Sequence, residues 1–159
     1  MSYNGSMSQD NAGVKFPPPL IFLMSILIGL GLTRMRPMSV VPEDLAMPLG
    51  IASIVAAFAL AFLGFHELGR HKTTMRIDKP SSAIVKTGPY RFTRNPLYVS
   101  LGALQLGIGL WTNSLWIVLM LIPVGITMTT QVIAREEAYL ERAFGEDYLR
   151  YKASVRRWI

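Results

Sequence analysis

The chain has 159 residues, of which 51% are hydrophobic and only 16% are charged. Soluble domains carry about 25% charged residues, so this composition indicates a membrane protein. No Asp, Glu, Lys, Arg or His occurs in three windows, residues 16–33, 45–65 and 95–134. The segments between these windows are too short to form an ordinary soluble domain, which excludes a separate enzyme domain attached to an anchor.

The formal charge of +6 follows membrane topology. A span needs roughly 20 apolar residues, so the first two windows predict one crossing each and the third predicts two. With four crossings, 14 of the 16 Lys and Arg residues share one side, and only Arg34 and Arg36 lie on the other. The positive-inside rule therefore predicts that both termini and the middle loop are cytoplasmic. Anionic lipids account for the basic charge, so we expect membrane lipids as partners and no nucleic acid.

Two residue types are scarce in the chain. Cysteine is absent, and the histidines are His66 and His71. These counts exclude disulfides and thiolate chemistry, and they predict no metal site. Glu67, Arg70 and His71 have the i, i+3, i+4 spacing of a helix that continues for one solvated turn beyond the second span.

In chain order, residues 1–15 are rich in Ser, Asn, Gly and Gln and predict a disordered leader. A single membrane domain follows over residues 16–159. Its four spans are predicted at about 17–34, 45–66, 96–111 and 114–134, followed by a cytoplasmic segment at 135–159. The first apolar core is also short enough for a signal peptide, but no small-residue cleavage site follows it, which favours a membrane helix.

The third window contains its own turn. Thr112, Asn113 and Ser114 lie between Trp111 and Trp116, the pattern of a tight hairpin with aromatic residues at the headgroup level. The small residues of the third span, Gly102, Ala103, Gly107 and Gly109, predict close helix packing. Pro123 predicts a kink in the fourth span, which could open a cavity beside it.

The segment after residue 134 is amphipathic. One helical stripe contains Leu140, Phe144, Tyr148, Tyr151 and Val155. A break is expected near residue 145, where a glycine precedes two acidic residues. This tail is predicted to pack on the membrane surface or on the middle loop. The fold class is therefore all-α integral membrane, with about four transmembrane helices, a cytoplasmic middle loop and an amphipathic C-terminal helical segment.

The hairpin should bring two polar clusters together at the cytoplasmic surface. They are GPYRFTRNPLY, residues 88–98, and REEAYLERAFG, residues 135–145. Because the two spans are antiparallel and nearly equal in length, the start of one meets the end of the other. Charges at the mouth of an apolar bundle suggest a functional site. Each cluster also has a structural interpretation, since Asn95-Pro96 is a good helix start and the other charges can be solvated.

In this order and spacing, the clusters resemble the isoprenylcysteine carboxyl methyltransferase family of integral-membrane methyltransferases, which includes bacterial members and phospholipid methyltransferase relatives. The resemblance lies in TGPYRFTRNPLYVS at residues 87–100 and EEAYLERAFGEDYLRYKASVRRW at residues 136–158. It covers roughly residues 70–159. Asn95 stands where many members have His, and the sequence leaves open whether it replaces a functional His or only caps a helix.

This resemblance implies S-adenosylmethionine as cofactor, a lipophilic or lipid-modified substrate, and a bacterial inner-membrane location. Cofactor contacts are expected at two groups of residues. The first group is Tyr90, Arg94, Asn95, Pro96, Leu97 and Tyr98, and the second is Glu136, Glu137, Leu140, Tyr148 and Tyr151.

The acceptor determines which catalytic groups are needed. A carboxylate is already ionised and needs only a cation, for which Arg91 and Arg135 are the candidates. An amine or thiol needs a base, for which Glu136 and Glu137 are the candidates. Carboxyl O-methylation of a prenylcysteine-like substrate is therefore favoured over phospholipid N-methylation or thiol S-methylation. The competing classes are an NADPH-dependent sterol-type reductase and a non-enzymatic membrane binding protein. Oligomeric state is not readable from the sequence.

Overall fold

The computed structural model describes residues 17–71 and 84–159. The predicted leader and part of the middle loop lie outside the described residues. The described residues form α1 (Pro18–Met35), α2 (Glu43–Arg70), a short 3₁₀ turn η1 (Gly88–Arg91), α3 (Pro96–Trp111), α4 (Leu115–Leu119), α5 (Leu121–Thr127), a π-helical turn η2 (Met128–Ile133), α6 (Ala134–Phe144) and α7 (Glu146–Ser154).

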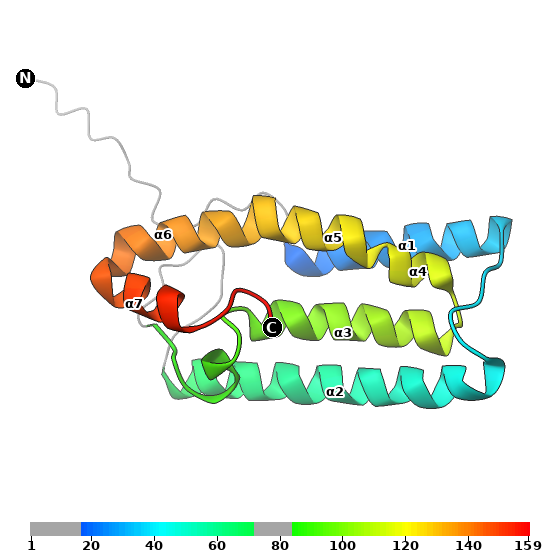
Figure 1. The fold of residues 1–159 in the computed structure, drawn as a ribbon, viewed down its shortest axis with the longest axis horizontal. Helices are drawn as coiled ribbons and strands as arrows, with labels where there is room; N and C mark the ends of the chain where they lie inside the picture. Colours follow the sequence, from blue (N-terminus) through cyan, green and yellow to red (C-terminus); the bar gives the residue numbers. More distant parts are fainter. Residues whose placement is uncertain (1–16, 72–83) are drawn as a thin grey trace, which may run out of the picture.

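The fold is an all-α integral-membrane fold, as predicted. In the described part of the chain, three helical stretches are long and apolar enough to cross a membrane: α1, α2 and the stretch Leu115–Phe144, which comprises α4, α5, η2 and α6. The third predicted span, α3, is a shorter apolar helix of 16 residues. In Figure 1, α1, α2, α3 and the α4–α6 stretch run along the long axis of the molecule, and α3 lies beside α2.

Small residues allow α2 and α3 to pack closely. A Cβ atom added to Gly107 would lie 2.9 Å from the backbone nitrogen of Ile54, and one added to Gly50 would lie 2.5 Å from the backbone nitrogen of Trp111. The hydroxyl of Ser53 donates a hydrogen bond to the Ala103 carbonyl across the same interface. The prediction of close packing is wrong for Gly102, because nothing lies within 4 Å of a Cβ atom added there.

The predicted hairpin joins α3 to α4. Asn113 adopts a left-handed conformation with φ 46°, which Asn tolerates better than most residues. Its side chain accepts hydrogen bonds from the backbone of Val40 and Val41 and donates one to the Val41 carbonyl. The hairpin therefore holds the connection between α1 and α2 at this end of the bundle.

The fourth helical stretch is interrupted near Pro123. α4 ends at Leu119 and α5 begins at Leu121, so the break precedes the proline by one turn, where its missing N–H and its ring disturb the helix. A second irregularity, η2, follows α5 and is not signalled by the sequence pattern. Met128, Val132 and Ile133 of η2 pack with Phe22, Tyr98 and Val124 in the main buried cluster.

The break at Gly145 occurs where it is predicted. α6 ends at Phe144, Gly145 has φ 53°, and α7 begins at Glu146. A positive φ favours glycine because it has no Cβ. The turn sends α7 back along the bundle, and the C-terminus finishes beside the start of α3 (Figure 1). We call this end, with the start of α3, α6, α7 and the C-terminal residues, the site end.

Candidate active site

The C-terminal residues pair with the segment that precedes α3. Thr93 and Arg156 form an isolated parallel bridge, in which the Arg94 N–H donates to the Arg156 carbonyl at 2.9 Å. The side-chain amide of Asn95 donates to the carbonyl of Arg157 at 2.8 Å. Asn95 occupies the N-cap position of α3, but its side chain makes no capping bond. Its amide therefore joins two chain segments, which the capping interpretation did not anticipate.

A buried carboxylate joins these segments to α6. The Glu137 side chain is only 6% exposed. Its Oε1 lies 3.0 Å from Nη2 of Arg94, and Arg157 donates from Nε and Nη2 to the two carboxylate oxygens at 3.0 and 2.7 Å. The ammonium of Lys152 lies 3.6 Å from Oε2. We call Arg94, Glu137, Lys152 and Arg157 the Glu137 cluster.

The cluster leaves one buried donor available. The Arg94 side chain is 8% exposed and also donates to the Lys152 carbonyl at 3.3 Å. Among the described residues, its Nε has no hydrogen-bond partner. A buried guanidinium N–H without an acceptor costs free energy. This N–H can therefore donate to an anionic or carbonyl oxygen of a ligand. The hydrogen bonds with Glu137 raise the pKa of Arg157 above its usual range, which keeps that side chain charged.

Glu136 has different surroundings from Glu137. Consecutive helical residues point about 100° apart, so their carboxylates face different neighbours. The Tyr98 hydroxyl donates to Glu136 Oε1 at 2.6 Å, and Tyr98 itself is buried in the main apolar cluster. In the described part of the chain, no cationic side chain forms a salt bridge with Glu136. Its carboxylate can therefore act as a base or face a cationic group.

Three buried tyrosines line the site end. Tyr148 and Tyr151 of α7 pack edge to face, and the Tyr151 hydroxyl donates to the Tyr90 carbonyl at 2.8 Å. Burial raises the pKa of Tyr151 to about 12 and raises the pKa values of Tyr90 and Tyr148 further. All three hydroxyls therefore remain protonated at neutral pH and can donate hydrogen bonds.

The structure corrects the interpretation of Glu67 as a solvated residue. Glu67 is buried at 8% exposure, while the Arg70 side chain is 65% exposed and makes a 3.2 Å contact with it. The Thr87 hydroxyl donates to Glu67 Oε2 at 2.6 Å. Gly88, with φ 58°, lies so close that an added Cβ would be 2.5 Å from Glu67 Cγ. Glu67 therefore fixes the turn that begins the TGPYR segment at residues 87–91.

The structure brings together many, but not all, of the predicted site residues. The proximity of the two polar clusters is observed, with Arg94 at Glu137 and Tyr98 at Glu136. Four other predicted residues have different surroundings. Leu97 packs with Leu68, Val85 and Tyr90; Arg91 is exposed on η1; Arg135 donates to Gln131 of η2; and Leu140 is half-buried on α6.

Other site residues were missed by the sequence prediction. Lys152 and Arg157 were counted among the positive-inside charges, although a basic residue in the last turn of a helix or just after it is also a candidate partner for a buried acid. Pro96 was predicted correctly in position, at the first turn of α3, where it is buried. Trp158 donates from Nε1 to the Thr129 hydroxyl at 3.2 Å and so anchors the C-terminus to η2.

A comparison of the sequence with known proteins identifies a family. The family model described as phospholipid methyltransferase matches residues 45–147, which include most of α2 and all of α3 to α6. An uncharacterized protein of Haemophilus influenzae is 41% identical over 63 residues, which are 40% of this chain and 100% of that protein. No solved structure matches the chain. The chain therefore belongs to the phospholipid methyltransferase family, an integral-membrane methyltransferase family related to the isoprenylcysteine carboxyl methyltransferases.

Proposed function

We propose that this protein transfers the methyl group of S-adenosylmethionine to a lipophilic acceptor held in the membrane. The observation that carries the proposal is the Glu137 cluster, in which the segment before α3, α6, α7 and the C-terminal residues meet around one buried carboxylate. Arg94 and Glu137 of this cluster lie in the segment that matches the methyltransferase family, and Lys152 and Arg157 follow within ten residues of its end.

The residues present fit the chemical groups of the cofactor. Its amino-acid carboxylate needs a basic donor, and the unpartnered Nε of buried Arg94 is one. Its cationic sulfur needs a negative neighbour, and Glu136, without a salt bridge among the described residues, is available. Its adenine needs apolar and aromatic walls, which Tyr148 and Tyr151 supply.

The chain's main contribution to methyl transfer is alignment. The cofactor supplies an electrophilic methyl group, so no covalent nucleophile is needed. Arg94, Tyr98 and Glu136 would hold the reacting groups in line, which contributes to the rate by fixing their orientation. The paired C-terminal segment and the buried tyrosines would exclude water from the site.

For the acceptor we propose a carboxylate on a prenylcysteine-like molecule, with Arg91 or Arg135 as the cation that holds it. Phospholipid N-methylation is the second candidate, and two observations favour it. The matching family is that of phospholipid methyltransferases, and the Glu136 carboxylate, which accepts from the Tyr98 hydroxyl, would accept a proton from an amine or, in the S-methylation alternative, from a thiol. We further propose an inner-membrane location, with both termini in the cytoplasm.

Calorimetry in detergent tests the cofactor assignment. We expect binding of S-adenosylmethionine and of its demethylated product. Binding of NADPH alone would favour the reductase alternative, and binding of none of the three would favour a non-enzymatic protein. A radiolabelled methyl-transfer screen over prenylcysteine analogues, phosphatidylethanolamine, fatty acids and small thiols then identifies the acceptor.

Two variants test the location of the site. Arg94→Ala and Glu137→Ala should each weaken S-adenosylmethionine binding at least hundredfold, because each removes a buried partner of the cluster. Arg150→Ala is the matched control, since Arg150 is 74% exposed and pairs with Asp147, away from the Glu137 cluster. Measurements of membrane insertion and of the thermal unfolding temperature in detergent check that the variants are folded. Unchanged affinity in both site variants would place the pocket elsewhere.

A further inference from the structure

The π-helical turn η2 lies directly before the two adjacent glutamates of α6. The Ala134 N–H donates to the carbonyl of Thr129, five residues back, where an α-helix uses the carbonyl four residues back. A turn of this kind takes up one more residue than an α-helical turn. Met128, Val132 and Ile133 of η2 are buried in the main apolar cluster, so the turn belongs to the packed core. Single π-helical turns are frequent at functional sites, and η2 has a direct effect on this one.

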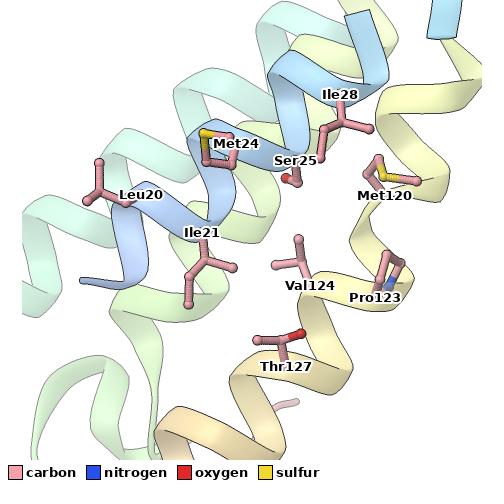
Figure 2. Close-up of a pocket in the computed structure, with 9 residues that line it drawn as sticks. All are labelled: Leu20, Ile21, Met24, Ser25, Ile28, Met120, Pro123, Val124 and Thr127. Carbon is pink, nitrogen blue, oxygen red and sulfur yellow. The ribbon is translucent and has the colours of Figure 1, made fainter. Parts of the chain in front are cut away.

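The extra residue of η2 decides which way the side chains of α6 point. Val124 marks the inward face of this stretch, because it is buried in the same cluster as Tyr98. In Figure 2, it points from α5 toward Ile21 of α1, across the apolar pocket beside Pro123. At about 100° per residue, Glu136 would lie about 120° away from Val124 around an uninterrupted α-helix. The wider turn removes about 100° of this rotation, so Glu136 comes within about 20° of the Val124 direction and meets Tyr98.

Without the wide turn, the preceding residue would take each of the two acidic places. Arg135 would face the Tyr98 hydroxyl, and Glu136 would lie where Glu137 now lies, beside Arg94. A cation would then replace the carboxylate next to Tyr98. The wide turn therefore gives the site two acids, one at Tyr98 and one in the Glu137 cluster.

Threonine side chains support the irregular backbone of η2. The Thr129 and Thr130 hydroxyls donate to the carbonyls of Gly125 and Ile126, at 2.7 and 2.9 Å. Within a spanning helix no water can replace a lost backbone partner, and threonine side chains supply one. The Thr129 hydroxyl also accepts a hydrogen bond from Trp158 Nε1 at 3.2 Å, whereas Thr130 is exposed. Thr129 therefore connects η2 to the C-terminal residues.

Two consecutive C-terminal residues hold the helix on both sides of Glu136. Arg157 donates to Glu137, the next residue along α6. Trp158 bonds Thr129, which precedes Glu136 by two turns, and also packs against the main apolar cluster. A rotation of α6 relative to η2 would break both attachments. The C-terminal residues thus favour the orientation in which Glu136 faces Tyr98.

We propose that η2 orients the Glu136 carboxylate toward Tyr98, and that Thr129 and Trp158 are positioning residues that keep η2 in its π-helical form. The inference rests on the proposed methyltransferase function for the reaction in which Glu136 takes part. When the bond between Thr129 and Trp158 is lost, the stretch populates the α-helical form. In that form α6 is rotated by about 100° and Glu136 is turned away from Tyr98.

A distance between two spin labels tests the orientation of α6 without any acceptor. The chain has no cysteine, so nitroxides can be attached at Gly69→Cys on α2 and Ala138→Cys on α6, both of which are exposed. In the full chain in detergent, double electron–electron resonance should give one narrow distance. We expect a second distance in Thr129→Val, because rotation moves the label on α6 around the helix axis. Trp158→Phe keeps the ring and removes the N–H, and it should give the same second distance.

Matched variants separate this role from general stability. Thr130→Val removes the neighbouring hydroxyl, which donates to its own i−4 carbonyl in the same way, and should keep the single distance. Thr129→Ser retains the hydroxyl and should also keep it. A single distance in both Thr129→Val and Trp158→Phe would overturn the proposal. So would an equal second distance in Thr130→Val, because the link to Trp158 would then be irrelevant.

Methyl transfer by the unlabelled variants tests the connection to the reaction. The acceptors are N-acetyl-S-farnesylcysteine and phosphatidylethanolamine, and the wild-type protein should methylate one of them. Thr129→Val should lower kcat roughly tenfold or more, because Glu136 loses its alignment, and Thr129→Ser should restore it. The KM for S-adenosylmethionine should change less than about threefold, because Glu136 replaces Glu137 among the cations.

Failure of this inference and failure of the proposed function give different results. A wild-type protein that binds no S-adenosylmethionine and methylates neither acceptor contradicts the proposed function, while a second distance in Thr129→Val still supports the role of η2. A Thr129→Val protein that shows the second distance and keeps its full kcat contradicts the role of η2 in the reaction, while the methyltransferase function stands.

Discussion

At the residue scale, the two adjacent glutamates of α6 have distinct surroundings. Glu137 is enclosed by Arg94, Lys152 and Arg157, so its carboxylate stabilises the junction of three chain segments. Glu136 meets the Tyr98 hydroxyl at the edge of the apolar core. The first arrangement is suited to holding the site together, and the second is suited to contact with a reacting group.

Tyr98→Phe isolates the role of the Tyr98 hydroxyl, because the ring remains in the core. A hydrogen bond to a charged group contributes about 1.5–3 kcal/mol. We therefore expect kcat/KM for methyl transfer to fall roughly ten- to hundredfold, with the protein still folded. Thr112→Val removes a hydroxyl at the opposite end of α3 and should leave kcat/KM unchanged. A Tyr98→Phe protein with full activity would contradict a role for the Tyr98–Glu136 pair.

The contact between Thr87 and Glu67 supports the turn before α3. Thr87→Val removes the hydroxyl and leaves the buried Glu67 carboxylate with one fewer donor, at a cost of about 1 kcal/mol. We expect the Tm in detergent to fall by about 2–4 °C. Thr87→Ser keeps the hydroxyl and should retain the Tm. Equal melting of the two variants would mean that this bond does not stabilise the fold.

At the element scale, the C-terminal residues form a strap across the start of α3. The bridge at Thr93 and the Asn95 amide attach it to the segment before α3, the Arg157 guanidinium attaches it to α6, and the Trp158 indole attaches it to η2. These contacts come from residues 156–158. The strap thus completes the Glu137 cluster although it lies outside the segment that the family model matches.

Deletion of residues 155–159 tests the strap. It removes two arginines and leaves Glu137 buried with fewer cations, so we expect S-adenosylmethionine affinity to fall at least hundredfold. The shortened protein should still insert into the membrane, because the deleted residues lie outside the spanning helices. Deletion of Ile159 alone is the control, since that residue is 84% exposed. Calorimetry measures both proteins, and full affinity in the longer deletion would assign the pocket to other elements.

At the scale of the whole molecule, the arrangement of spans predicts one common side for the site end and both termini. The chain has no cysteine, so single cysteines can be introduced without background. In spheroplasts, a membrane-impermeant maleimide should label Ser39→Cys, between α1 and α2, and label Ala153→Cys only after lysis. Both positions are exposed. The reverse labelling pattern would invert the proposed topology.

The elements themselves follow from local properties of the sequence. Apolar windows, Pro96 at the start of α3, the polar turn at Asn113 and the glycine at 145 each act within a few residues, and α1, α2, α3, the turn at Asn113 and the break at Gly145 are found where the pattern places them. The meeting of residues 88–98 with residues 135–145 was also predictable, because antiparallel helices of equal length leave few alternatives.

The sequence by itself therefore determined the all-α membrane fold, the positions of the helices and the proximity of the two polar clusters. Only the tertiary structure decided that Glu67 is buried, that Asn95 bonds the C-terminus and that Lys152 and Arg157 surround Glu137. The physical reason is that helix formation and membrane insertion depend on neighbouring residues. Pairing of a buried charge depends on a partner that the chain brings back from far along the sequence.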